Sequence, residues 1–228
     1  MKNINQGLLL IVILISALNL GFSQTNEIKI RFIGNCGLHM TDGKTDVYSD
    51  FPYKSGAYNY MEYEDSEIDS LKENAHFIFT HKHADHYSGK NIRKVIKEKN
   101  GQKYGSWNID ALEKLGETIP NFSIQAFKTK HKFSLNHYSY LINWNDKSIF
   151  LSGDTESAET IGSIENIDWA FVPYWLLLDA TEKGIVINTK MYGIYHLATV
   201  QAPSANEKWG DLKNYHPLIK QGEIITIE

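Results

Sequence analysis

The segment from residue 80 to residue 86 is the densest polar cluster of the chain. It reads THKHADH and supplies His81, His83, Asp85 and His86 directly after an apolar segment at residues 75–80. Because alternate residues of an extended segment point to the same side, His81 and His83 can reach one ion together. The turn that follows can bring Asp85 and His86 to a second ion nearby. Imidazole and carboxylate donors suit divalent metals such as Zn²⁺, so this segment predicts a metal site.

The composition limits how else a metal could be held. The 228 residues include nine His and a single Cys, Cys36. One Cys cannot close a disulfide within the chain, and imidazole and carboxylate rather than thiolate are expected to bind any metal. Cys36 is expected to be a small buried residue. The formal net charge of −4 argues against a nucleic acid as the main partner.

The first 23 residues are expected to form an export signal. Lys2 gives a positive start, residues 8–15 are an unbroken apolar run, and Gly21-Phe22-Ser23 resembles a cleavage site. The run is shorter than the roughly 18 to 20 residues that cross a bilayer, so a membrane anchor is the weaker alternative. We therefore expect a periplasmic or secreted protein with no stable membrane anchor after cleavage, and a mature domain at residues 24–228.

The rest of the chain alternates strand-like and helix-like segments. Apolar patterns predict strands at residues 27–33, 46–51, 75–80, 123–130, 138–144, 148–152, 167–173, 191–195 and 223–227. Helices are predicted at residues 65–71, 88–97, 110–115, 155–161 and 204–212. Because no linker or repeat interrupts these elements, we expect one domain of the α/β (α+β) class, with helices covering its sheets.

The HxHxDH segment and several others resemble the metallo-β-lactamase fold superfamily. The others are residues 32–37, 41–44 and 50–52, the Ser152-Gly153-Asp154-Thr155 segment, and residues 167–173 and 192–196, in the family's order. This resemblance covers essentially the whole mature chain and implies a four-layer αββα sandwich. It also implies two metal sites, and the following residues would bind them: His81, His83 and a third His at one, Asp85, His86 and His196 at the other, with Asp154 between them.

Two histidines compete for the place of the third ligand. Both His131 and His137 precede a strand that leads to the Gly153-Asp154-Thr155 segment. His131 ends an alternating strand, at the kind of loop where ligands gather, whereas His137 lies almost inside the next strand. We prefer His131 and keep His137 as the alternative.

The resemblance implies a hydrolase that uses a metal-bound hydroxide. Two divalent ions, expected to be Zn²⁺ with Mn or Fe as alternatives, would activate a shared water, and Asp85 would aim it. Asp154 argues against a true β-lactamase, because those members lack this bridging residue. The expected substrate is a small molecule with an ester, lactone or amide bond. The alternatives are a phosphodiester hydrolase of the same fold, with Lys54, Lys128 or Lys130 near the metals, and a non-catalytic metal-binding protein.

Several other segments have two interpretations. The aromatic residues 51–63 are too irregular for a helix or strand, and either form a flap over the metals or pack on the flank. Residues 174–178 are expected to be core, with a place in the cleft as the alternative. His39, His76 and His216 are expected to be structural or peripheral.

Overall fold

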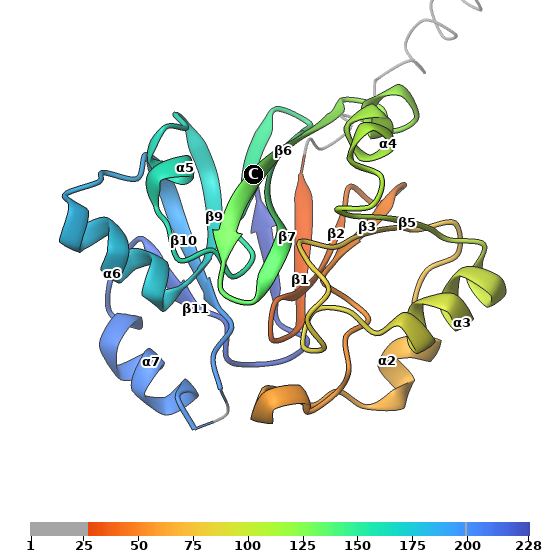
Figure 1. Cartoon of the computed structure of the whole chain (residues 1–228), viewed down its shortest axis with the longest axis horizontal. Helices are drawn as coiled ribbons and strands as arrows, with labels where there is room; N and C mark the ends of the chain where they lie inside the picture. The colour runs from red at the N-terminus through yellow and green to blue at the C-terminus, as the bar shows by residue number, and fades with distance from the viewer. Residues whose placement is uncertain (1–26, 199) are drawn as a thin grey trace, which may run out of the picture.

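The protein is a sandwich of two six-stranded sheets (Figure 1). The computed structural model describes residues 27–198 and 200–228. The first sheet has the order β12-β1-β2-β3-β4-β5, and the second has the order β11-β10-β9-β8-β7-β6. The expected export signal at residues 1–23 lies outside the described residues. Within the described residues, no helix has the length and apolar character needed to cross a membrane.

The strands of each sheet come mainly from one half of the chain. The first sheet contains β1 (Ile28–Gly34), β2 (Gly37–Thr41), β3 (Asp46–Ser49), β4 (His76–Ile78), β5 (Gln102–Tyr104) and the last strand, β12 (Ile224–Ile227). The second contains β6 (Phe122–His131), β7 (Ser134–Trp144), β8 (Lys147–Leu151), β9 (Ile167–Pro173), β10 (Thr189–Tyr195) and β11 (Tyr215–Pro217). Pairing of β1 with β12 brings the two ends of the described chain together.

Helices cover the outer faces of both sheets. The first sheet is covered by α2 (Asp65–Asp69) and α3 (Gly89–Lys99), and the second by α5 (Glu159–Gly162), α6 (Tyr174–Lys183) and α7 (Ala202–Trp209). The short α4 (Ile109–Glu113) and η2 (Lys114–Glu117) close one end of the sandwich, and η1 (Ala57–Asn59) lies in the loop after β3. The predicted four-layer αββα architecture is therefore confirmed (Figure 1).

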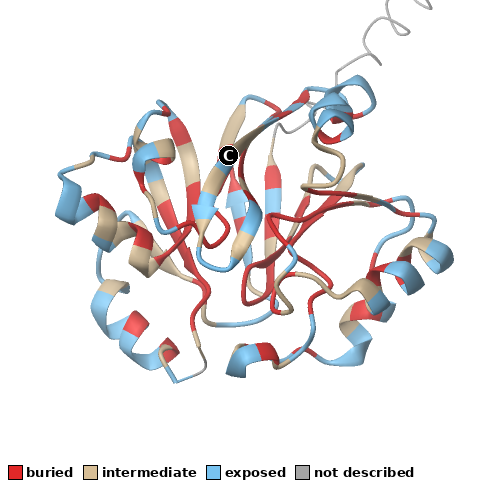
Figure 2. Ribbon diagram, in the orientation of Figure 1, coloured by how far each residue is buried: buried red, intermediate tan, exposed pale blue. Residues whose placement is uncertain are grey.

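Side chains alternate between the two faces of the strands. The buried apolar residues therefore form three clusters, one between the sheets and one under the helices of each sheet. In β9, Phe171 faces the opposite sheet, while Ala170 and Val172 pack under the helices. Strands buried on both faces in this way are typical of parallel sheets covered by helices. In α3, Ile92 and Val95 form the buried side of the helix, against the first sheet. Figure 2 shows the result, with buried residues concentrated in the strands and exposed residues on the outer sides of the helices.

Parallel strand pairs direct their carboxyl ends to one edge of the sandwich. In the first sheet β3, β4 and β5 are parallel, and in the second β8, β9, β10 and β11 are parallel. The segments after β4, β8 and β10 carry the expected metal ligands except His131, which ends β6. In open α/β sheets, ligand sites form outside the carboxyl ends of strands, so this edge is where a site is expected.

The observed elements differ from the predicted ones in detail. The strand expected at 46–51 ends at Ser49, because Asp50 has a φ of 46° and turns the chain. The helix expected at 155–161 begins only at Glu159. Sequence patterns did not predict β2, β5 and β11, which are short, or α6, whose first residues read as an apolar core segment.

Candidate metal centre

Three imidazoles form the first group of metal donors. His81 and His83 follow β4 of the first sheet, and His131 ends β6 of the second. One ring nitrogen from each lies within 4.8 Å of the others, and His131 Nε2 is 3.2 Å from His83 Nδ1. His81 Nε2 is buried and has no hydrogen-bond partner among the described residues. One divalent cation would satisfy all three facing nitrogens.

A second, deeper group contains His86, Asp154, His196 and Cys36, all buried. His86 Nε2 lies 3.0 Å from Asp154 Oδ1, and His196 Nε2 lies 2.9 Å from Asp154 Oδ2. Asp85 borders the group, with Oδ2 3.2 Å from His196 Nε2. In the described part of the chain, neither Nε2 atom has a partner in hydrogen-bonding geometry. Buried nitrogens without such partners around ionised carboxylates fit a bound cation.

The carboxylate of Asp154 lies between the two groups. Its oxygens contact His86 and His196 on one side, and Oδ2 is 3.9 Å from both His81 Nε2 and His131 Nε2 on the other. One carboxylate therefore faces both sets of donors. This is the arrangement needed to bridge two neighbouring ions.

Burial and charge act differently on the two groups. Burial lowers the pKa of His81 and of His131, so these imidazoles are neutral and able to coordinate a metal. Burial also opposes the charged forms of His86 and His196, but the Asp154 carboxylate raises both pKa values above the usual range. These two imidazoles hold the pKa of Asp154 well below its usual range, although burial opposes this. The deeper group therefore contains an ionised carboxylate at neutral pH.

Asp50 fixes the orientation of the His86 ring through the nitrogen that faces away from the second group. Its buried carboxylate accepts hydrogen bonds from the backbone N–H and the hydroxyl of Thr80, both at 2.8 Å. His86 Nδ1 lies 2.9 Å from the same carboxylate. With Nδ1 held by Asp50, His86 Nε2 is the nitrogen that faces the second group.

The turn between β1 and β2 holds together two loops of the site. Asn35, in the left-handed region with a φ of 51°, donates from Nδ2 to the Asp85 carbonyl at 2.8 Å. The Asn35 carbonyl accepts from the backbone N–H of His196 at 3.1 Å. One turn near the start of the fold thus positions ligand-bearing segments from both halves of the chain.

Cys36 follows in the same turn. As expected it is buried, but it is not remote from the metal centre, because its Sγ lies 3.9 Å from Asp154 Oδ1. Burial, and then the Asp154 carboxylate, raises the pKa of the Cys36 thiol well above its usual range. The sequence pattern gave no indication that Cys36 lies beside the candidate metal centre.

His131 and His137 have different surroundings. His131 lies in the first group, whereas both nitrogens of His137 are already used: Nδ1 lies 2.7 Å from Thr129 Oγ1, and Nε2 accepts from the Asp154 backbone N–H at 2.8 Å. Burial lowers the pKa of His137 to about 3, so it stays neutral. Gly153, with a φ of +57°, passes so close that a Cβ there would lie 2.6 Å from His137 Nε2. His137 therefore supports the loop of Asp154 and has no free nitrogen.

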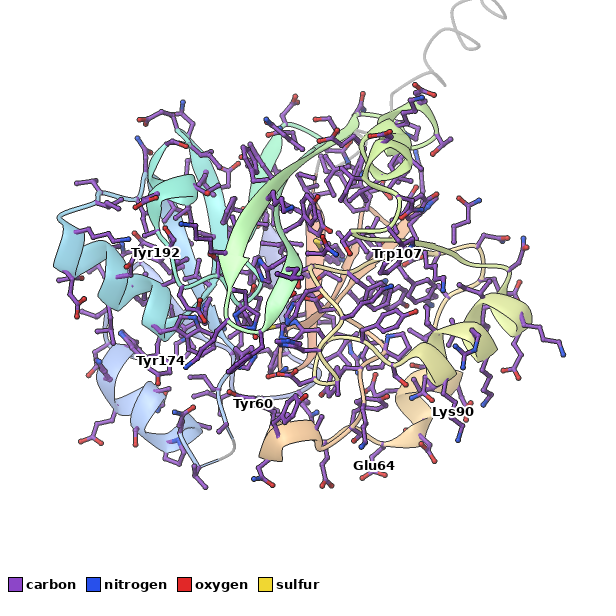
Figure 3. All side chains as sticks on the ribbon, in the orientation of Figure 1. Tyr60, Glu64, Lys90, Trp107, Tyr174 and Tyr192 are labelled. Carbon is purple, nitrogen blue, oxygen red and sulfur yellow. The ribbon has the colours of Figure 1, made fainter. Side chains whose placement is uncertain are left out.

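A cavity of about 560 Å³ opens over both groups. It is lined by Tyr58, Tyr60, His83, Asp85, His131, Lys132, Phe133, Asp154, Glu156, Trp175 and His196. The rings of Tyr60 and Trp175 flank His196, with centroids at 4.2 and 5.0 Å from its ring centroid. Figure 3 labels Tyr60 among the side chains of the molecule. The aromatic segment at residues 51–63 thus has both expected roles, because Tyr58 and Tyr60 line the cavity while other aromatics of the segment pack in the core. Residues 174–178 also have both roles, since Trp175 lines the cavity and Leu176 is core.

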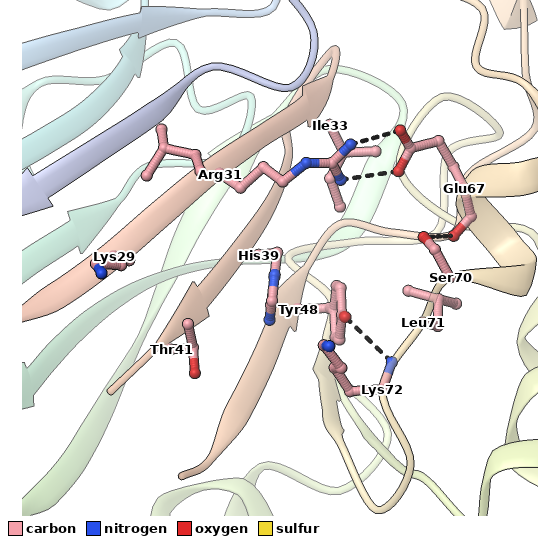
Figure 4. A pocket seen from close by; sticks show the side chains of 11 residues that line it. Lys29, Arg31, Ile33, His39, Thr41, Tyr48, Glu67, Ser70, Leu71 and Lys72 are labelled. Carbon is pink, nitrogen blue, oxygen red and sulfur yellow. Dashed lines mark hydrogen bonds and ion pairs between the residues drawn. The ribbon is translucent and has the colours of Figure 1, made fainter. Parts of the chain in front are cut away.

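Three other histidines lie outside both groups. His39 stacks on Tyr48 and lies 2.6 Å from Asp46. It lines a separate hollow of about 380 Å³, in which Arg31 makes a two-pronged ion pair with Glu67 (Figure 4). His76 is half-buried in β4, and His216 lies 3.5 Å from Glu223.

Several solved protein structures are similar to this protein over most of its chain. No protein-family model and no curated protein matches the sequence. YhfI of Bacillus subtilis, a metallo-β-lactamase fold protein, has 15% identity and a TM-score of 0.58 over 88% of this chain and 99% of its own. The chain has the metallo-β-lactamase fold.

Two further structures with this likeness carry different chemistry. Igni18, a metallo hydrolase of the archaeon Ignicoccus hospitalis, has 14% identity and a TM-score of 0.61 over 89% of this chain and 99% of its own. CmlA of Streptomyces venezuelae is a diiron β-hydroxylase with 12% identity and a TM-score of 0.55, over 88% of this chain and 54% of its own. The metallo-β-lactamase fold alone therefore does not select the reaction.

Some residues of the site were not predicted as functional. Asp50 and Asn35 lie in segments that resemble the family, and Tyr60 lies in the candidate flap, but none of the three was given a role of its own. Their contributions depend on contacts with residues far away in the chain, such as His86 and His196. Asp50 directly follows β3, which pairs with β4, the strand before the HKHADH segment, and this position is the signal that could have identified it.

Proposed function

We propose that the protein is a dinuclear metal-dependent hydrolase of small molecules with an ester, lactone or amide bond. The position of the Asp154 carboxylate between two groups of donors carries this proposal. His81, His83 and His131 would hold one ion, and the deeper group with Asp85 would hold the other. Zn²⁺ fits the imidazole and carboxylate donors, with Mn or Fe as alternatives. When bound, such ions lower the pKa of water and withdraw charge from the substrate oxygen.

Asp85 is the residue best placed to orient the attacking water. Its carboxylate lines the cavity, and Oδ1 has no hydrogen-bond partner among the described residues. Burial opposes ionisation of Asp85, but His196, whose Nε2 lies 3.2 Å from Asp85 Oδ2, lowers its pKa below the usual range. An ionised carboxylate with a free oxygen can accept a hydrogen bond from water and hold it in line with the substrate.

Tyr60 is placed to act on the substrate rather than on the water. Burial, and then the nearby Asp154 carboxylate, raises the pKa of Tyr60 to about 12, so its hydroxyl stays protonated at neutral pH. It can therefore donate a hydrogen bond to an oxygen on which negative charge develops. The rings of Tyr60 and Trp175 also exclude water from the side of His196.

The charges of the cavity favour a neutral substrate. The lining contains one Lys and one Glu outside the metal groups, Lys132 and Glu156, whose charges offset each other. Lys54, Lys128 and Lys130, the residues expected to bind a phosphodiester, are not among the lining residues. Tyr58, Phe133 and Trp175 supply aromatic surface. This composition favours an ester, lactone or amide over a phosphodiester.

The test combines metal analysis with an activity screen. Protein purified with Zn²⁺, Mn²⁺ or Fe²⁺ is expected to bind about two ions per chain and to turn over at least one ester, lactone or amide substrate. The His83→Ala variant should lose one ion and its activity by a factor of about 100 or more, because a catalytic ion supplies several kcal/mol. His39→Ala is the matched control, since His39 lies in the separate hollow.

Two outcomes would contradict the proposal. Turnover of phosphodiesters alone would favour the phosphodiesterase. A non-catalytic metal-binding protein would be favoured if the wild type bound two ions tightly but showed no turnover on any substrate of the panel. Wild type and His83→Ala would then not differ in turnover.

We also propose that the protein is exported. The charge, apolar run and small residues of positions 1–23 support this. Amino-terminal sequencing of the protein from the periplasm or medium should begin near residue 24, and full-length protein confined to the cytoplasm would contradict it.

A further inference from the structure

We propose that Cys36 is a ligand of the deeper metal ion, which makes this a mixed site of imidazole, carboxylate and thiolate. The inference rests on the proposed dinuclear centre and adds a donor to it. It replaces the view, drawn from the low Cys content, that thiolate has no part in metal binding.

The first argument is the distance between donors. Cys36 Sγ lies 3.9 Å from Asp154 Oδ1, and Cys36, His86, Asp154 and His196 each offer one atom within 4.8 Å of the others. Bond lengths of about 2.3 Å for Zn–S and about 2.1 Å for Zn–O place two donors of one tetrahedral ion about 3.6 Å apart. Only a small movement of the side chain would bring the sulfur to this separation.

The second argument is that the other donors of the group point to the same place. His86 Nε2 and His196 Nε2 are buried and, among the described residues, have no partner in hydrogen-bonding geometry. The sulfur approaches Asp154 Oδ1, the same oxygen that lies 3.0 Å from His86 Nε2. The thiol is thus one of several donors that surround a common point.

The third argument is that the backbone fixes Cys36 in this position. Its neighbour Asn35 is bonded to the backbone of Asp85 and of His196. The same turn therefore sets the sulfur and two proposed ligands relative to one another. A buried Cys needed only as a small apolar residue requires no such connection to the metal-binding loops.

A thiolate changes which metals the deeper site prefers. Thiolate is a soft ligand that favours Zn²⁺ and other late transition metals, whereas Mn²⁺ and Mg²⁺ prefer oxygen donors. The outer group, with three imidazoles, lacks this preference. We therefore expect the two sites to differ in their selectivity, with Mn²⁺ competing less well at the deeper one.

Cobalt substitution tests the ligand directly, without an activity assay. Wild type loaded with Co²⁺ should show visible d–d bands and a near-ultraviolet thiolate-to-cobalt charge-transfer band. Cys36→Ser should lose the charge-transfer band and keep d–d bands from the outer group. Met40→Leu removes another buried sulfur from the adjacent strand β2 and should keep both features.

X-ray absorption of the zinc protein gives a second measurement that depends only on the wild type. A sulfur shell at about 2.3 Å is expected, and its absence would overturn the proposal even if Cys36→Ser failed to fold. Cobalt d–d bands without the charge-transfer band would also overturn it, while leaving the dinuclear centre intact. Failure of the wild type to bind metal at all would overturn both proposals.

Discussion

At the scale of single residues, the histidines of the site differ in what their second nitrogen does. Asp50 occupies Nδ1 of His86 and leaves Nε2 facing the deeper group. Both nitrogens of His137 are occupied, by Thr129 and by the backbone of Asp154. This difference, and not the type of residue, separates a proposed ligand from a supporting residue.

Replacing His131 or His137 by Ala should therefore have different effects. His131→Ala should lose about one ion per chain with little loss of stability. His137→Ala leaves the buried backbone N–H of Asp154 without its partner and opens a cavity, so it should lower the free energy of unfolding by about 3 kcal/mol. Elemental analysis and denaturant unfolding of the metal-free proteins separate the two. The reverse pattern would identify His137 as the ligand.

Gly153 offers a measure of how tightly His137 holds the Asp154 loop. Gly153→Ala combines a left-handed φ with a Cβ placed 2.6 Å from His137 Nε2 and 2.9 Å from Thr80 Cβ. Gly184→Ala is the matched control, because its φ is +65° and nothing lies within 4 Å of the added Cβ. The control should lose about 1 to 2 kcal/mol of stability and Gly153→Ala clearly more. Equal losses in denaturant unfolding would show that the contact is not tight.

At the scale of secondary-structure elements, strand ends rather than strand interiors carry the site. At the opposite, amino-terminal ends of the strands, Asp168 of β9 connects its neighbours, since it accepts from the Ser148 N–H in β8 at 2.7 Å and from the Lys190 ammonium in β10 at 2.6 Å. Burial opposes ionisation of Asp168, but these two donors lower its pKa below the usual value. Its ionised form therefore stabilises the pairing of three strands.

The stability that Asp168 contributes should depend on pH. Its pKa is lower in the folded than in the unfolded state, so the contribution is full above the unfolded value of about 4 and is lost as the pH falls through the folded value. Asp168→Asn should lower the free energy of unfolding by about 1 kcal/mol at pH 7 and by much less near pH 2. Unfolding of the metal-free protein at both pH values checks this, with the exposed Asp211→Asn as the control. A pH-independent difference would contradict the assignment.

Sequence patterns predicted long elements and missed short ones. The alternation in β6 and the apolar run at residues 169–172 of β9 are strong enough to predict strands, whereas β5 and β11 have three residues each and show no period. Spacing within the HKHADH segment indicated a metal site because its residues are neighbours in the chain. The contact between Cys36 and Asp154 could not be predicted from the sequence, because it depends on how two turns far apart in the chain pack together.

At the scale of the whole molecule, the proposed centre joins the two halves of the sandwich. His81, His83, Asp85 and His86 come from the first sheet, and His131, Asp154 and His196 come from the second. Ions bound between them would connect the sheets at one edge, in addition to the apolar core between them.

Removal of metal should therefore lower the thermal stability of the whole protein. Free metal at about 100 times Kd stabilises the folded state by about 2.7 kcal/mol for one site. For a chain of this size, that corresponds to a decrease in Tm of about 5 to 10 °C on chelation. Calorimetry with and without a chelator measures this, and His83→Ala should show a smaller decrease. An unchanged Tm in the wild type would contradict binding between the sheets.

The turn at Asn35 has a consequence for the order of events in folding. It bonds to Asp85, 50 positions later, and to His196 near the end of the chain, and its strand β1 pairs with the last strand, β12. Contacts across so much chain close late, because the loop entropy must be overcome first. The donors of the deeper group thus meet only when both sheets are in place. We therefore expect the metal-free chain to fold first and the proposed deeper site to take up its ion afterwards.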